Sequence, residues 1–233
     1  MSRDFEISPD FPSKSYTDIF VIVDRFIKAT QPELQTVVSS INPWTEFTGG
    51  WNAVSARFEG CTDASEAYTK LVIEAGNSPA VPMRYTQDNE LFIFFFAGFA
   101  VLDSLAYSLF SLGNMLASPE FPMNTEDDLK SITFAFTAKR FSTHYPREDL
   151  SAKLNALLAT AKYEEWKNVR NILAHRVAPG RNFYMGGDKN GLTEWTIGVA
   201  IDDNTTQSRR IWLCRQLVEL LIATQTFLAG RIV

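Results

Sequence analysis

Residues 91–112 read LFIFFFAGFAVLDSLAYSLFSL, an apolar run with one charged side chain, Asp103. The run approaches the length that spans a bilayer. A membrane span would place Asp103 near mid-bilayer, and no Lys or Arg follows the run before Lys130 to anchor it. We therefore expect a helix buried in a protein core, with no membrane contact. The alternative, a membrane-associated protein that inserts this run, predicts that the protein depends on detergent.

Working outward from this run, we expect helices on both sides of it. Apolar residues recur at helical spacing in residues 16–29, 148–177 and 208–228. The pattern in 148–177 fits one bent helix or two consecutive helices. Further helices are predicted to begin at Pro32, over 63–76, over 88–117, and from a cap at Thr125 toward His144.

Segments without helical periodicity complete the pattern. Residues 41–60 contain Pro43 and the pair Gly49 and Gly50, which favours an irregular segment. Residues 77–87 contain two prolines and read as a linker. Residues 182–185 and 195–201 flank a Gly-rich turn, and the second stretch alternates apolar and small residues, which predicts a β-hairpin.

These patterns predict a mainly α protein, an antiparallel helical bundle with a short β-hairpin before the C-terminal helix. We expect an N-terminal helical extension and linker over 1–87 and the bundle over 88–233. The alternative is that both parts pack as a single domain.

The composition excludes several classes of protein. The chain has 233 residues, 45% of them hydrophobic, with Cys61 and Cys214 as its two cysteines, so neither a disulfide framework nor a thiolate zinc site is expected. The two histidines form no HExxH pattern, and neither a GxSxG elbow nor a Walker loop is present. We therefore expect no metal and no cofactor. The polar, acidic start lacks a signal-peptide pattern, which favours a cytoplasmic location.

The charge distribution is uneven. The net charge of −5 argues against a general nucleic-acid-binding surface. Residues 139–181, however, hold nine Lys or Arg and four Asp or Glu, a local charge of +5. This basic segment is either a set of solvated helix faces or the surroundings of a site for an anion.

The basic segment contains the heptapeptide RNILAHR, residues 170–176. On a helix, Asn171 and His175 share a face. Arg170 lies about 100° away around the helix axis, and its side chain is long and flexible. A guanidinium suits phosphate oxygens, an imidazole serves as an acid or base, and an amide can orient either group. The combination points to phosphodiester cleavage without a metal. The alternative is a structural polar cluster at a dimer seam.

Asp103 and Asn168 are candidate supporting residues. Asn168 shares the face of Asn171 and His175, because its spacing from them is three and seven residues. Asp103 is either the partner of Arg170 or His175, or a member of a buried polar network with Tyr107.

Arg170 followed by Asn171, with His175 five positions after the arginine, late in a helical bundle and continued as AHR and a proline, resembles the HEPN superfamily. The signature of that family is Arg, a gap of about four to six residues, then His. The resemblance covers residues 88–228 and implies an antiparallel helical bundle that dimerises. It implicates Arg170, Asn171 and His175 as catalytic residues, with Arg176 adjoining them.

The resemblance implies a metal-independent endoribonuclease of toxin or defence type, acting on RNA as a homodimer, with an antitoxin or another regulatory protein as a partner. His175 would then act as base or acid on the ribose phosphate, with Arg170 stabilising the transition state. The competing interpretation is a non-catalytic helical module that binds RNA, nucleotide or protein.

Overall fold

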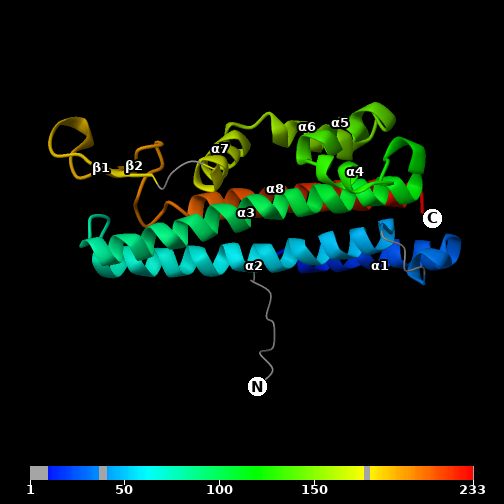
Figure 1. Ribbon diagram of the computed structural model, residues 1–233, viewed down its shortest axis with the longest axis horizontal. Helices are drawn as coiled ribbons and strands as arrows, with labels where there is room; N and C mark the ends of the chain where they lie inside the picture. Colours follow the sequence, from blue (N-terminus) through cyan, green and yellow to red (C-terminus); the bar gives the residue numbers. More distant parts are fainter. Residues whose placement is uncertain (1–9, 37–40, 176–178, 233) are drawn as a thin grey trace, which may run out of the picture. The chain divides into compact units, whose positions relative to one another are not determined.

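The structure is a computed structural model that describes residues 10–36, 41–175 and 179–232. These residues form α-helices, three short 3-10 helices and a two-stranded antiparallel sheet before the last helix (Figure 1). This confirms the predicted mainly helical bundle with a β-hairpin. The bounds are α1 Ser13–Thr30, α2 Pro43–Ala75, α3 Val81–Leu116, α4 Glu126–Ser131, α5 Phe134–His144, α6 Asp149–Leu158, α7 Ala161–His175, β1 Arg181–Phe183, β2 Thr193–Trp195 and α8 Gln207–Ala229.

The prediction of an irregular segment over 41–60 is wrong, because α2 begins at Pro43 and continues to Ala75. Asn42 caps this helix: its side-chain oxygen accepts hydrogen bonds from the backbone N–H of Trp44 and Thr45 at 2.9 and 3.3 Å. Proline suits the first helical position, where its missing N–H has no intrahelical acceptor. Gly50 is explained by packing, since a Cβ there would lie 2.6 Å from the Ser108 hydroxyl.

Three other predicted boundaries are corrected. The linker predicted over 77–87 is wrong from residue 81 onward, because Pro82 lies in the first turn of α3. A 3-10 helix, Pro32–Gln35, takes the place of the helix predicted to begin at Pro32. The helix predicted toward His144 is two helices, because Thr133 starts α5 by accepting a hydrogen bond from the Phe136 N–H at 3.2 Å.

The described chain divides into two compact units, each discontinuous in sequence. Unit 1 combines the described parts of Met1–Ala56, Ala100–Thr160 and Cys214–Val233. Unit 2 combines Arg57–Phe99 and Ala161–Leu213. Helices α2, α3 and α8 contribute residues to both units. The predicted boundary at residue 87 stays a prediction.

Unit 1 has a core rich in aromatic rings. The Tyr16 ring of α1 stacks on Trp51 of α2 with 4.9 Å between ring centroids, and the Tyr16 hydroxyl donates to the Trp51 carbonyl at 2.7 Å. On α5, Phe141 is fully buried and contacts Phe121 and Phe227 edge-on. Edge-on pairs of this kind stabilise a core beyond their area burial.

In unit 2, α2 and α3 run antiparallel (Figure 1). Gly60 of α2 lies opposite Ala97 of α3, and the Gln87 amide donates to the Leu71 carbonyl at 3.2 Å. Between these two contacts the α2 residue number increases while the α3 residue number decreases, as in an antiparallel pair.

The β-hairpin of unit 2 pairs β1 with β2 in the register Asn182 opposite Glu194. This unit carries the heptapeptide.

Two helices, α3 and α8, are long and apolar enough to cross a membrane by length and composition. In their most apolar windows, 61% of the α3 residues and 44% of the α8 residues are buried within the protein. A buried core helix passes the same test of length and hydropathy. The expected absence of membrane contact stays a prediction.

Candidate functional site

Helix α7 positions the heptapeptide in unit 2. Its buried side chains are Tyr163, Trp166 and Val169, spaced three residues apart, so one face of the helix packs inward. Trp166 is fully buried and its ring lies 4.9 Å from the Phe94 ring, measured between centroids. The face that carries Asn168 and Asn171 is directed away from these anchors and is more exposed.

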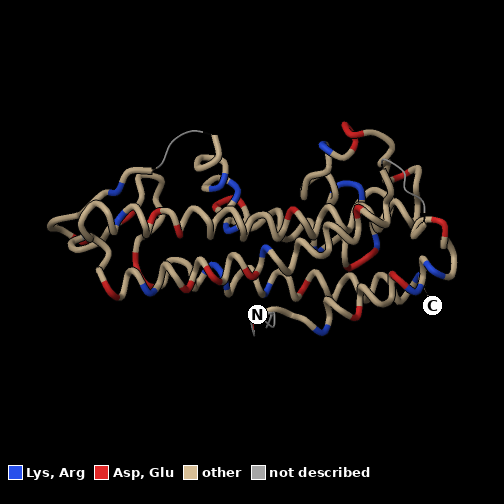
Figure 2. Tube along the Cα trace, turned by 60° about the horizontal axis from the view of Figure 1, so that its bottom comes forward, with Lys and Arg blue, Asp and Glu red and all other residues tan. Residues whose placement is uncertain are grey.

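Charged side chains hold the first half of α7 in place; Figure 2 marks the positions of the charged residues along the backbone. The Glu165 carboxylate accepts hydrogen bonds from Lys162 at 2.8 Å and from both Nε and Nη2 of Arg209, the Nε bond measuring 3.1 Å. Partial burial acts to raise the Glu165 pKa, but these hydrogen bonds and the two positive charges outweigh it, so its pKa lies below the usual range. Arg209 is itself 93% buried and belongs to α8, so the pair joins two helices.

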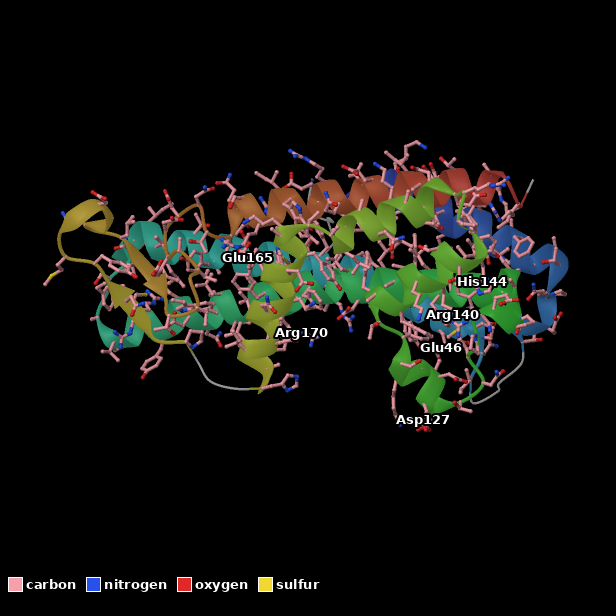
Figure 3. All side chains as sticks on the ribbon, turned by 90° about the horizontal axis from the view of Figure 1, so that it is seen from above. Glu46, Asp127, Arg140, His144, Glu165 and Arg170 are labelled. Carbon is pink, nitrogen blue, oxygen red and sulfur yellow. The ribbon has the colours of Figure 1, made fainter. Side chains whose placement is uncertain are left out.

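Arg170, labelled in Figure 3, is half-buried on α7, and its contacts within unit 2 include Phe99 and Asn171. Its guanidinium carbon lies 5.1 Å from the centroid of the Phe99 ring, which is a cation–π distance. Its Nη1 donates a hydrogen bond of 3.0 Å to Oδ1 of Asn171. The guanidinium is therefore positioned from its face by a ring and from its edge by an amide.

His175 is the last residue of α7 and is exposed, as is Asn168. Within the described residues, no hydrogen bond or ion pair joins His175 to Arg170 or Asn171. The structure thus brings Arg170 and Asn171 together and leaves the imidazole open to solvent one turn further along. These positions leave the assignment of catalytic roles a prediction.

The remaining supporting residues are Arg176 and Asp103. Arg176 is outside the described residues. Asp103 belongs to unit 1, where it is half-buried on α3, and its pairing with Arg170 or His175 stays a prediction. In the part of the chain that the structure describes, no group of three or more His, Cys, Asp or Glu is placed to hold a metal ion.

A pocket in unit 2 was missed by the sequence reasoning. Its volume is about 650 Å³, and its walls come from the first turns of α3, from Leu173 on α7, from residues 179–181 and from Trp195 on β2. Leu173 lies between Arg170 and His175 in the heptapeptide. The pocket depends on Arg181 meeting Asp88, 93 positions away in sequence, and no local pattern signals such a pair.

Hydrogen bonds link the polar residues of this pocket. Arg181 donates to Asp88 Oδ1 from Nε at 3.0 Å and from Nη2 at 2.7 Å, and Trp195 Nε1 donates to the same oxygen at 2.9 Å. Arg181 Nη1 also donates to Gln87 Oε1 at 2.8 Å. The Arg181 side chain is 1% exposed, and each of its guanidinium nitrogens donates a hydrogen bond, so the arginine of this ion pair is buried with its donors satisfied.

Comparison with known proteins adds nothing to this geometry: no protein-family model, no curated protein and no solved structure matches the chain.

Proposed function

We propose that this chain is an HEPN-like, metal-independent endoribonuclease. The observation that carries the proposal is the hydrogen bond between Arg170 and Asn171 on a helix that ends in the exposed imidazole of His175. A phosphate-binding group held by an amide, with an acid or base within reach of solvent, is what cleavage of a phosphodiester requires. The Phe99 ring beneath the guanidinium restricts its motion further.

In the proposed reaction, His175 accepts the proton of a ribose 2′-OH. The 2′-oxygen then attacks the adjacent phosphorus, and the bond from phosphorus to the 5′-oxygen breaks. The leaving oxygen takes a proton, and the products are a 2′,3′-cyclic phosphate and a 5′-hydroxyl. Arg170 stabilises the charge that builds on the phosphoryl oxygens, and Asn171 is a positioning residue for Arg170.

The proposed enzyme is a homodimer. An isologous interface would place two copies of α7 about one two-fold axis and so combine both residue sets in one cleft. One His175 would then serve as the base, and the partner subunit's His175 as the acid. A cytoplasmic toxin or defence role, restrained by an antitoxin or another regulatory protein, fits this activity.

The test is incubation of the purified full chain with labelled single-stranded RNA in EDTA. We expect cleavage that leaves cyclic phosphate ends, and a 2′-deoxy substitution at the cleaved linkage should block it. His175→Ala should lower the rate by about 10² to 10⁴-fold with folding unchanged. Lys167→Gln is the matched control, since it removes a positive charge from the same helix and breaks an ion pair with Glu164 and a 6.0 Å contact with the Tyr163 ring, neither of which involves the heptapeptide.

Cleavage that persists in His175→Ala would reject the assignment of His175 as a catalytic residue.

The second candidate function is a non-catalytic module. The half-buried position of Arg170 over Phe99 favours it, because an arginine with a purely structural role would pack in the same way. RNA binding without turnover by the unmodified chain would select the module. Light scattering in solution measures the mass and tests the dimer.

A further inference from the structure

The pocket of unit 2 has the features of a binding site for a small ligand. Its volume of about 650 Å³ falls in the range of about 300–1,000 Å³ that is common for such sites. Three aromatic side chains, Tyr85, Phe92 and Trp195, line it together with Arg84 and Asp88. Apolar walls with a few charged groups are the usual composition of a site that selects its ligand.

Asp88 is a fixed hydrogen-bond acceptor in this pocket. Its Oδ1 receives three hydrogen bonds, two from Arg181 and one from Trp195. The Arg181 side chain and the Trp195 residue are each 1% exposed, so moving either donor away from Asp88 would disrupt the packing around it. Within the described residues Oδ2 has no partner, and the Asp88 side chain is 26% exposed. A ligand with an N–H donor can use that oxygen.

The charges of the pocket favour an anion. Asp88 is neutralised by Arg181, which leaves the Arg84 guanidinium as an excess positive charge at the wall. No carboxylate of the described residues forms an ion pair with Arg84. Because a guanidinium binds phosphate and carboxylate oxygens through a planar fork, Arg84 is suited to the acidic group of a ligand.

Two of the aromatic walls are open to solvent. The exposed fraction is 67% for Tyr85 and 39% for Phe92, so part of each ring faces solvent. They lie on α3 seven residues apart, which is about two turns, and so share a face of the helix. A planar ring that stacks on either side chain would cover this apolar surface.

We propose that this pocket binds a nucleoside monophosphate, with its base stacked on Tyr85 or Phe92, an exocyclic or ring N–H donated to Asp88 Oδ2, and its phosphate on Arg84. The nucleotide is either free or the unpaired residue of an RNA strand, since both present the same groups. This site is separate from the proposed RNA cleavage and requires none of Arg170, Asn171 and His175.

Calorimetric titration of the full chain with AMP, GMP, CMP and UMP tests the proposal, with the matching nucleosides as ligands that lack the phosphate. We expect saturable binding of at least one nucleotide that carries an N–H donor. Arg84→Gln should weaken that nucleotide at least tenfold and leave its nucleoside nearly unchanged. Tyr85→Ala or Phe92→Ala, whichever removes the ring that stacks on the base, should weaken both by about fivefold or more.

Lys70→Gln is the matched control, because it removes one positive charge from an exposed position on α2 that does not line this pocket. It should leave nucleotide binding unchanged. If a short single-stranded RNA competes with the mononucleotide for this pocket, the ligand is a residue of an RNA strand. If the RNA does not compete, the ligand is the free nucleotide. Both results support the proposed chemistry.

Three results would overturn the proposal: no nucleotide binding at millimolar concentration, equal binding to the unmodified chain and Arg84→Gln, or binding of indole-3-acetate, an aromatic carboxylate, in preference to every nucleotide. The proposal is tested separately from the ribonuclease. His175→Ala should abolish cleavage and keep nucleotide binding, so the failure of one does not imply the failure of the other.

Discussion

The ring of Trp166 on α7 lies directly against the backbone of Gly98 on α3. A Cβ built on Gly98 would come within 2.3 Å of two carbons of the Trp166 ring and 3.0 Å of the Cys61 sulfur. Glycine at this position therefore lets the buried tryptophan of α7 approach α3 closely. The heptapeptide begins four residues after this contact, so the contact sets where Arg170 projects.

Gly98→Ala should destabilise the protein through overpacking, by about 1–3 kcal/mol. Gly60→Ala is the matched control: it is also a helical glycine of unit 2, but its nearest neighbour, the Cβ of Ala97, is 3.9 Å away. That change should be neutral or stabilise by up to about 1 kcal/mol, because alanine favours helix. Urea unfolding measures both. Equal effects of the two substitutions would contradict the close approach of Trp166.

Glu165→Gln should destabilise the protein by about 1–3 kcal/mol at neutral pH, since it leaves the buried Arg209 without its carboxylate. The folded-state pKa of Glu165 lies below its unfolded value. Its contribution to stability is therefore fully present above the ordinary glutamate pKa of about 4.3, and is lost as pH falls through the lowered folded value. The difference between the unmodified chain and the variant should shrink in that acidic window.

Urea unfolding at pH 6 and again below pH 4 checks this dependence on pH. The neighbouring Glu164→Gln is the control, because Glu164 forms an exposed pair with Lys167 and should contribute less than about 1 kcal/mol. A difference for Glu165→Gln that stays constant down to pH 3 would mean that its carboxylate does not interact as described.

Arg181→Met should cost about 3–5 kcal/mol, because it leaves the Asp88 carboxylate without its buried partner. Protection of the β1 and β2 amides against hydrogen exchange should fall together with global stability. Arg147→Met is the control, since Arg147 is exposed and its replacement should change stability by less than about 0.5 kcal/mol. Unchanged protection of the hairpin in Arg181→Met would show that the ion pair does not hold it.

Asn171→Ala should lower RNA cleavage by about tenfold or more if Arg170 stabilises the transition state, because the guanidinium loses the amide that orients it. The loss should appear mainly in kcat. Asn168→Ala removes an exposed amide from the same face of α7 that has no hydrogen bond to Arg170 in the described residues, and should have a smaller effect. Equal losses from the two changes would count against a positioning role for Asn171.

Local pattern predicted the elements that depend on local chemistry. The apolar run at 91–112 lies in a helix, and the two residues Pro179 and Gly180 follow the heptapeptide helix. The last helix lies where it is expected, and the predicted hairpin is present, but its second strand is Thr193–Trp195 and not residues 195–201. These features follow from side-chain periodicity and from residues that break a helix, and both are properties of neighbouring positions.

Patterns that depend on distant contacts were read wrongly or not at all. Gly50 is predicted in an irregular segment, but it lies inside α2, where the close approach of the Ser108 hydroxyl leaves no room for a Cβ. Pro82 looked like part of a linker, but it occupies the first turn of α3. In both cases the residue type is shared by loops and by special helix positions, and only the packing tells them apart.

For this chain the amino-acid order alone determined the helical class, the hairpin before the last helix, and an arginine, an asparagine and a histidine close together on one helix. The tertiary structure decided which of these meet: Arg170 with Asn171 and Phe99, and Arg181 with Asp88. The reason is that helical spacing acts over a few residues, whereas the pocket forms from segments 93 positions apart that meet when the core is buried.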